Sequence, residues 1–260
     1  MKPLRVVLAG LVAFAVALAV LVWFMPARLA LPLLQSRLRG LQWKQVSGMI
    51  WQGEAGQVTM TGGMSLGRVA WTLSRRALIG DIQLGVDLRQ PQLQLHGSMH
   101  RLSPTQDEWR NVTLRMDSAL LGAQPWLHGQ PQGWLDLHIA QAQLQGGWPM
   151  QVDAEGHWAQ ASVRTAQGTF ALGTMPLSIK GQSGVLQATL DDDGSGALRT
   201  AGRLSFSPLG WDLRMSLKPR RSDPAFLHWL HMLGAPAPDG SVQLRYRGGL
   251  IPFNSATGNP

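Results

Sequence analysis

The sequence contains no cysteine and few charged side chains. Without cysteine, the chain forms no disulfide bond and offers no thiolate to a metal ion, although this does not assign a compartment. Charged residues make up 15% of the 260 residues, well below the average of about a quarter. The composition therefore excludes a disulfide-stabilised scaffold and a zinc module with cysteine ligands.

Recognisable motifs for catalysis and metal binding are also lacking. His228 and His231 lie three positions apart on a predicted helix, but no acid stands between them, so the zinc-protease pattern is missing. Residues 191–196 lack the alternating acids of a calcium loop, and we interpret them as the turn of a β-hairpin. We therefore predict no catalytic residue, no metal site, no cofactor and no enzymatic activity.

Positive charge exceeds negative charge, and the formal net charge is +8. A basic chain raises the question of nucleic-acid binding. Here the basic residues are scattered, with pairs at 75–76 and 220–221, and no nucleic-acid motif accompanies them. We predict no nucleic-acid partner and favour a basic surface near anionic lipid headgroups.

One long apolar run lies near the N-terminus. Residues 6–25 carry no charged side chain, and as a helix they would span about 30 Å, the thickness of the hydrocarbon core of a bilayer. We predict a single transmembrane helix over 6–25, behind a cytoplasmic stub over 1–5. A cleaved signal peptide is the alternative, because Lys2 and Arg5 precede the run and small residues within it resemble a cleavage site. A short stub before a long domain favours an N-in orientation.

Residues 26–42 form the predicted juxtamembrane segment. Leucines recur in it at helical spacing, at positions 31, 34, 38 and 41. The sequence leaves open whether this helix lies on the membrane surface or packs its leucines against the following domain.

Alternation of apolar and polar residues dominates the chain from 43 to 250. Clear examples are residues 82–88, 112–116, 135–139, 211–217 and 242–246. Such alternation is typical of strands with one buried face, and short strands separated by Gly, Pro or Asp indicate an antiparallel sheet. We predict a mainly β protein, in which a curved antiparallel sheet follows the membrane helix and a flexible tail covers residues 251–260.

One short helix is predicted near residues 224–233. Asp223 can cap it and Pro224 suits its first turn. Its apolar face would consist of Phe226, Leu227, Leu230 and Leu233.

The two halves of the predicted sheet resemble each other. Leu66-Gly67 matches Leu172-Gly173, and most matched segments lie 105–107 residues apart, although two lie 99 and 112 apart. This spacing suggests duplicated modules over 43–146 and 147–250.

Several short segments, taken in order, resemble protein N of the bacterial type II secretion system. They include residues 48–55, 69–73, 217–220 and 230–234. The resemblance covers nearly the whole chain, and it picks out these structural motif residues: Gly48, Trp51, Gly53, Leu66, Gly67, Trp71, Gly202, Leu217, Pro219, Arg220, Leu233, Gly234 and Gly240.

The resemblance implies a single-pass protein of the bacterial inner membrane, with its β domain in the periplasm. It implies an accessory, non-enzymatic role in exporting folded proteins across the outer membrane, together with other inner-membrane or secretin components and inner-membrane lipid as partners. It also brings a remote similarity to AsmA-type proteins with β-grooves. The alternative function is therefore a periplasmic module that shields or transfers lipid between membranes.

Overall fold

The computed structural model describes residues 24–29, 40–61 and 65–249. The chain divides between Gln90 and Pro91 into two compact units. In the described residues, every strand pair with a known register is antiparallel, which confirms the prediction of a mainly β, antiparallel fold.

Several predicted segments fall outside the described part of the chain. These are the stub over 1–5, the tail over 251–260, most of the juxtamembrane helix, and all of the predicted transmembrane helix except Phe24 and Met25. In the part of the chain that is described, no helix combines the length and the apolar character needed to cross a bilayer.

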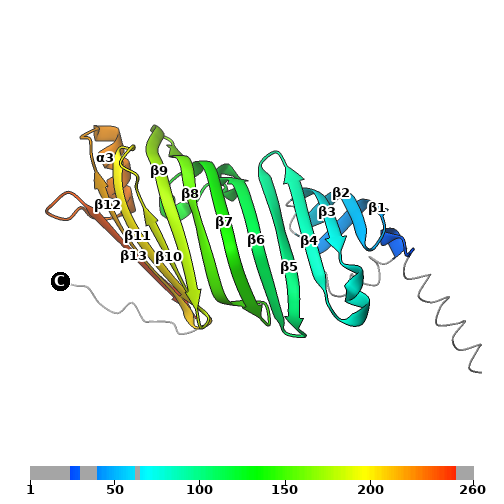
Figure 1. The fold of residues 1–260 in the computed structure, drawn as a ribbon. Coiled ribbons are helices and arrows are strands. Elements are labelled where there is room, and N and C mark those ends of the chain that lie inside the picture. Colours follow the sequence, from blue (N-terminus) through cyan, green and yellow to red (C-terminus); the bar gives the residue numbers. More distant parts are fainter. Residues whose placement is uncertain (1–23, 30–39, 62–64, 250–260) are drawn as a thin grey trace, which may run out of the picture. The chain divides into compact units, whose positions relative to one another are not determined.

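The first unit contains a four-stranded meander. Each strand pairs with the next one along the chain, and Figure 1 labels them in blue to cyan. The short helix η1 (Arg75–Ile79) connects the last two strands. The strands are β1 (Leu41–Gly48), β2 (Gln52–Met60), β3 (Ser65–Leu73) and β4 (Gln83–Gln90).

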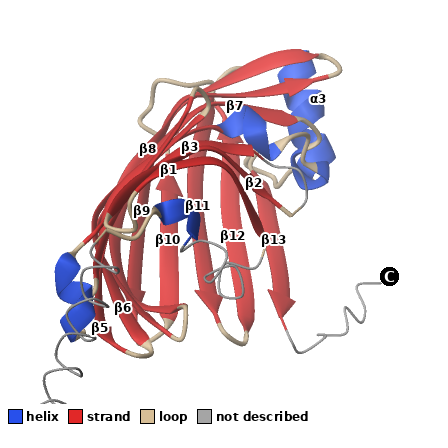
Figure 2. Cartoon of the chain, turned by 90° about the vertical axis from the view of Figure 1, so that its right-hand side faces the viewer, coloured by secondary structure: helices blue, strands red, loops and turns tan. Residues whose placement is uncertain are grey.

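The second unit contains a nine-stranded meander, again with each strand beside its successor. Figure 2 shows that this sheet is bent. Its strands are β5 (Leu93–Ser103), β6 (Gln106–Asp117), β7 (Gln130–Gln145), β8 (Trp148–Thr165), β9 (Gly168–Gln182), β10 (Val185–Asp191), β11 (Leu198–Ser207), β12 (Gly210–Pro219) and β13 (Val242–Gly249).

Alternating burial follows the alternation of the sequence. In β13, Val242 and Leu244 are buried, whereas Gln243 and Arg245 are exposed. Successive side chains of a strand point to opposite faces, so one face of the sheet is apolar and the other is polar. The strand segments predicted from alternation lie within strands, except that residue 82 precedes β4. Residues 192–196 lie in the connection from β10 to β11, directly after Asp191 ends β10, so the predicted hairpin turn is confirmed.

Several β-bulges or other register irregularities interrupt the long strands of the second unit, and two of them coincide with a non-glycine residue at positive φ. Asn111 in β6 and Gln160 in β8 have positive φ angles of 50° and 51°, and the register shifts by one residue beside each of them. A bulge bends its strand and increases its twist. These two positions therefore contribute to the curvature of the sheet.

Two connections of the second unit are long and carry helices. The connection from β6 to β7 holds η2 (Ser118–Leu121) and η3 (Pro125–Leu127), and the connection from β12 to β13 holds α3 (Pro224–Leu233). Figure 1 shows α3 alongside the ends of β11 and β12.

The helix α3 confirms the prediction for residues 224–233. Asp223 accepts hydrogen bonds from the backbone N–H of Ala225 at 2.9 Å and of Phe226 at 3.4 Å, which satisfies donors at the helix start. The buried face differs in one residue from the prediction, because Trp229 is buried while Leu227 is only half-buried.

The main hydrophobic core lies between α3 and the sheet of the second unit. Phe226, Trp229, Leu230 and Leu233 of α3 are in this core, and the rings of Phe226 and Trp229 both lie about 5.5 Å from that of Phe170. Offset and edge-on packing of aromatic rings adds to the free energy of burying them.

The predicted duplication remains a prediction. The matched segments Leu66-Gly67 and Leu172-Gly173 lie in β3 and β9, which are six strands apart in chain order. The two long connections, after β6 and after β12, are also six strands apart.

The core under α3 gives a first testable prediction. Leu230 is fully buried, so Leu230→Ala should lower the free energy of unfolding by about 2–5 kcal/mol, through lost burial and a new cavity. Urea denaturation followed by circular dichroism measures this change. The control is His231→Ala, because His231 is exposed on the next helical position. Equal stability of the two variants would contradict the placement of the core.

Candidate functional site

The histidines of α3 do not form a metal site with other described residues. His228 and His231 are both exposed. Within the described ranges, no group of three or more His, Asp or Glu side chains is placed to hold a metal ion.

In the first unit, the structure brings four motif residues together at one hairpin. Gly48 and Gly53 face each other across β1 and β2, and Trp51 lies in the turn between them. Trp71 of β3 pairs with Gly53, and its indole N–H donates to the carbonyl oxygen of Ile50 at 3.1 Å.

Gly53 is required by the indole that covers it. A Cβ atom at this position would lie 2.5 Å from the Trp71 ring, a distance that carbon atoms do not reach without a shift of one of them. The resemblance to protein N in residues 48–55 therefore reflects the packing of a tight hairpin against Trp71.

The motif residues Leu66 and Gly67 lie at a bulge in β3. Gly67 has a φ angle of +72°, and a Cβ atom there would lie 2.9 Å from the carbonyl oxygen of Arg89. The register between β2 and β3 shifts nearby. Glycine is favoured at such a position because it adopts positive φ without strain.

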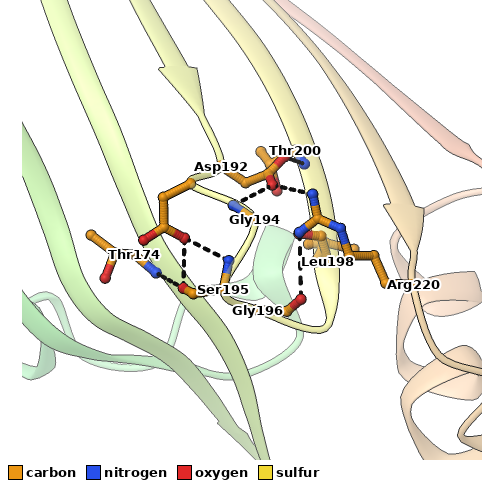
Figure 3. Close-up of polar contacts among 9 residues, drawn as sticks. Thr174, Asp192, Gly194, Ser195, Gly196, Leu198, Thr200 and Arg220 are labelled. Atoms are coloured by element: carbon orange, nitrogen blue, oxygen red, sulfur yellow. Dashed lines mark hydrogen bonds and ion pairs between the residues drawn. The ribbon is translucent and has the colours of Figure 1, made fainter.

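In the second unit, Arg220 binds the loop between β10 and β11 through an ion pair and hydrogen bonds. Its guanidinium forms an ion pair with Asp192 at 2.5 Å and donates to the carbonyl oxygen of Leu198 at 3.4 Å. Figure 3 shows this arrangement. The other carboxylate oxygen of Asp192 accepts from the backbone N–H of Thr200 at 2.8 Å.

Asp192 is held in its charged form. Only 8% of its side chain is exposed. Burial raises the pKa of Asp192, but hydrogen bonds from the Thr200 backbone and from Arg220, with the charge of Arg220, outweigh burial. The pKa of Asp192 therefore lies below its ordinary value of 3.8.

The same loop approaches β9 closely. The backbone N–H of Asp193 donates to the carbonyl oxygen of Thr174 at 3.1 Å, and the Ser195 hydroxyl accepts from the backbone N–H of Thr174 at 3.3 Å (Figure 3). A Cβ atom on Gly196 would lie 1.7 Å from the carbonyl oxygen of Leu172. Only glycine fits there.

A second ion pair ties the end of β12 to the turn before β13. Lys218 lies 3.3 Å from Asp239, and Asp239 accepts from the hydroxyl of Ser241 at 2.7 Å and from its backbone N–H at 3.1 Å. The hydrogen bonds from Ser241 and then that from Lys218 lower the pKa of Asp239 to about 2. Gly240, another motif residue, sits in this turn with a φ angle of +77°.

The remaining motif residues have packing roles in the second unit. Gly202 of β11 is buried and pairs with Met215. Pro219 ends β12, and Gly234 follows α3, where a Cβ atom would lie 3.0 Å from Val242. Leu217 and Leu233 are buried in the core.

An apolar cavity of about 380 Å³ lies on the apolar face of the second unit. Its floor consists of residues from β6 to β13, and its roof of residues from η2, η3 and α3. The motif residues Leu217 and Leu233 contribute to its lining. The roof is joined where the indole N–H of Trp229 donates to the carbonyl oxygen of Leu127 at 3.0 Å.

The sequence predicted only part of the cavity and of the helices that cover it. The leucines of α3 were identified, but the cavity was not, and residues 118–129 were not assigned to its roof. The helical spacing of Phe226, Trp229 and Leu233 was a signal that could have placed Trp229 on the buried face. No sequence signal connects Trp229 with Leu127, because they are 102 residues apart.

Sequence reasoning also missed a buried charge. Glu108 of β6 is only 3% exposed, pairs with Arg110 at 2.9 Å and accepts from the Gln141 side chain at 2.6 Å. Burial raises the pKa of Glu108, but Arg110 and then Gln141 lower it more, so the net shift is downward. An acid in an alternating strand looks solvent-exposed in the sequence, so no signal could have found it.

The Asp192–Arg220 pair gives a second prediction. Arg220→Met should lower the free energy of unfolding by about 1–3 kcal/mol at neutral pH, because it leaves a buried carboxylate without its charged partner. Urea denaturation of the variant, of Asp192→Asn and of the double variant measures the coupling between the two residues. The matched control is Arg221→Met, since Arg221 is the exposed neighbour.

The same pair predicts a pH dependence. A folded-state pKa of Asp192 below its ordinary value stabilises the fold above about pH 4, and this contribution is lost as the pH falls through the folded-state pKa. The stability difference between the wild type and Arg220→Met should therefore shrink on acidification. A difference that stays constant down to about pH 2 would contradict this assignment.

Comparisons with known proteins agree with the motif resemblance. The family described as "Type II secretion system (T2SS), protein N" matches residues 39–245. A protein of Vibrio cholerae serotype O1, named "Type II secretion system protein N", is 28% identical over 264 aligned positions, which cover 94% of this chain and 95% of the relative. No solved structure matches the chain. Because the family match spans most of the sequence and most of the described strands, the chain belongs to the protein N family of the type II secretion system.

Proposed function

We propose that the chain is a non-enzymatic accessory component of the type II secretion system, which exports folded proteins from the periplasm across the outer membrane. The observation that carries this proposal is family membership over residues 39–245. The relative of similar length from V. cholerae, which carries the name of this secretion protein, supports it.

The proposed location is the bacterial inner membrane. Residues 6–25 would anchor the chain as a single helix, with the N-terminus in the cytoplasm and both β units in the periplasm. The apolar run and the short stub before it support this arrangement.

The proposed partners are other inner-membrane or secretin components of the secretion system. A sheet edge offers unpaired backbone N–H and C=O groups, and another protein can add a strand to it. In the described residues, β13 pairs with β12 on one side. Its other side has no strand partner and only an isolated bridge from Val242, at the start of β13, to Pro236. We propose that this edge of β13 is the contact surface for a partner.

The edge of β13 gives a third prediction. A photoreactive amino acid in place of Arg245, which is exposed on β13, should cross-link the full chain in membranes of its source bacterium to another secretion component. Mass spectrometry of the cross-linked product identifies the partner. The control position is Arg203, which is exposed on the interior strand β11.

Two outcomes of this experiment would count against the proposal. Trapping at position 203 but not at 245 would show that the partner binds the face of the sheet and not its edge. Recovery of no secretion component from either position would overturn the proposal that the edge of β13 is the contact surface.

The proposed orientation gives a fourth prediction. A reporter enzyme that is active only in the periplasm, fused after residue 250, should be active in cells. A fusion of a reporter that is active only in the cytoplasm, at the same position, should be inactive. The reverse pattern would overturn the orientation, and with it the proposed place in secretion.

A further inference from the structure

The roof and floor of the apolar cavity come from parts of the second unit that are distant in sequence. The roof consists of the connection from β6 to β7 and of α3, which meet at the hydrogen bond between Trp229 and Leu127. The floor includes Leu135 of β7, Leu177 of β9 and Leu190 of β10. The cavity therefore extends across several neighbouring strands on one face of the sheet.

The lining of the cavity carries no charged side chain. Its polar members, apart from the tryptophans, are Ser118, Gln124 and Thr200. Ser118 donates to the carbonyl oxygen of Gly133 at 3.0 Å, and Gln124 donates to that of Leu121. A charged ligand would lose its hydration here without gaining a partner, which is strongly unfavourable.

Thr200 is the exception among these polar groups. It is 3% exposed, and its hydroxyl has no hydrogen-bond partner in the described part of the chain. An unsatisfied buried hydroxyl is costly. Because this oxygen is itself buried, it is not open to a compound in the cavity, and the lining offers an incoming ligand apolar contacts only.

The cavity is partly open to solvent. Leucines of its floor and two residues of its roof are not fully covered. Leu135, Leu177 and Leu190 are only half-buried, although they lie on the apolar face. At the roof, Leu121 is 53% and Trp126 is 49% exposed, and both also line the cavity. Exposed apolar side chains beside an apolar cavity mark the place where an apolar ligand enters.

The volume limits the size of the ligand. Sites for small molecules measure roughly 300–1,000 Å³, and the cavity, at about 380 Å³, falls at the low end of that range. It fits one extended aliphatic chain better than two chains side by side.

We propose that this cavity binds one aliphatic acyl chain, which enters between Leu121 and Trp126 and lies across the leucines of β7, β9 and β10. The carbonyl of the acyl group and the polar head of the compound stay at the rim, where water reaches them. The inference depends on the cavity alone and does not require the proposed role in secretion.

Photolabelling of the full chain in membranes tests this proposal. One probe is a monoacylglycerol with a diazirine on its chain, and the other is a phosphatidylethanolamine with a diazirine on one of its two chains. After irradiation, extraction in digitonin and proteolysis, mass spectrometry locates the labelled residues. We expect label on peptides that line the cavity, such as those with Leu135, Leu177 or Leu190.

Cavity-filling variants make the test specific. Leu190→Trp should reduce labelling of the cavity peptides at least fivefold, because the indole would fill the space that the acyl chain occupies. The matched control is Thr189→Trp, which places the same side chain on the opposite face of β10 and should leave labelling unchanged. Leu135→Trp on β7 serves as a second filling variant if Leu190→Trp does not fold, as judged by circular dichroism.

The two probes distinguish the possible sources of the acyl chain, and the other outcomes test whether the cavity binds an acyl chain at all. Cavity labelling by the monoacylglycerol alone supports a free single-chain compound, and labelling by the phosphatidylethanolamine supports a membrane lipid. Absence of label from the cavity with both probes would overturn the proposal, as would equal labelling in Leu190→Trp and Thr189→Trp. Loss of the cross-link from position 245 would bear on the secretion partner and not on the cavity.

Discussion

The apolar face of the second sheet has to be covered, and the rest of that unit is arranged around this requirement. A single antiparallel sheet cannot bury its own apolar face, because the apolar side chains of all its strands point to the same side of the sheet. Another part of the protein has to cover that side. Two long connections supply the cover, and the hydrogen bond from Trp229 to Leu127 joins them. A sheet of nine strands is wider than the cover that these connections provide. The leucines on its floor are therefore half-buried, and a cavity remains.

Two ion pairs of this unit lie at the two ends of the connection that carries α3. Arg220 pairs with Asp192 where the chain leaves β12, and Lys218 pairs with Asp239 where it approaches β13. Both pairs flank the connection that carries α3, so they fix where this helix begins and where the chain returns to the sheet. The first pair is the better shielded from solvent, so salt and water screen its charges less. The position of α3 thus depends on the burial of its own apolar side chains and on the ion pairs at the two ends of the connection from β12 to β13.

The sequence predicted the strands and α3 because their signals are local. Alternation in β13 and helical spacing in α3 each express burial of one face, and the cap Asp223 stands directly before its helix. The connection from β6 to β7 has neither period, and its role depends on a contact with Trp229 over 102 residues. The pairing of Asp192 with Arg220 spans 28 residues and two strands. Such contacts follow from the tertiary fold, so the cavity and its roof could not be read from the sequence.

Apart from Arg220, which forms the ion pair with Asp192, the residues that carry the family resemblance have roles in packing or in turns. Gly53 lies under the indole of Trp71, and Gly240 forms the turn before β13, so neither has a side chain that could act on a substrate. Leu217 and Leu233 belong at once to the hydrophobic core and to the cavity lining. A substitution at either leucine changes the stability of the unit and the shape of the cavity together. In this chain, the packing that the core requires at these two positions therefore also sets the shape of the cavity.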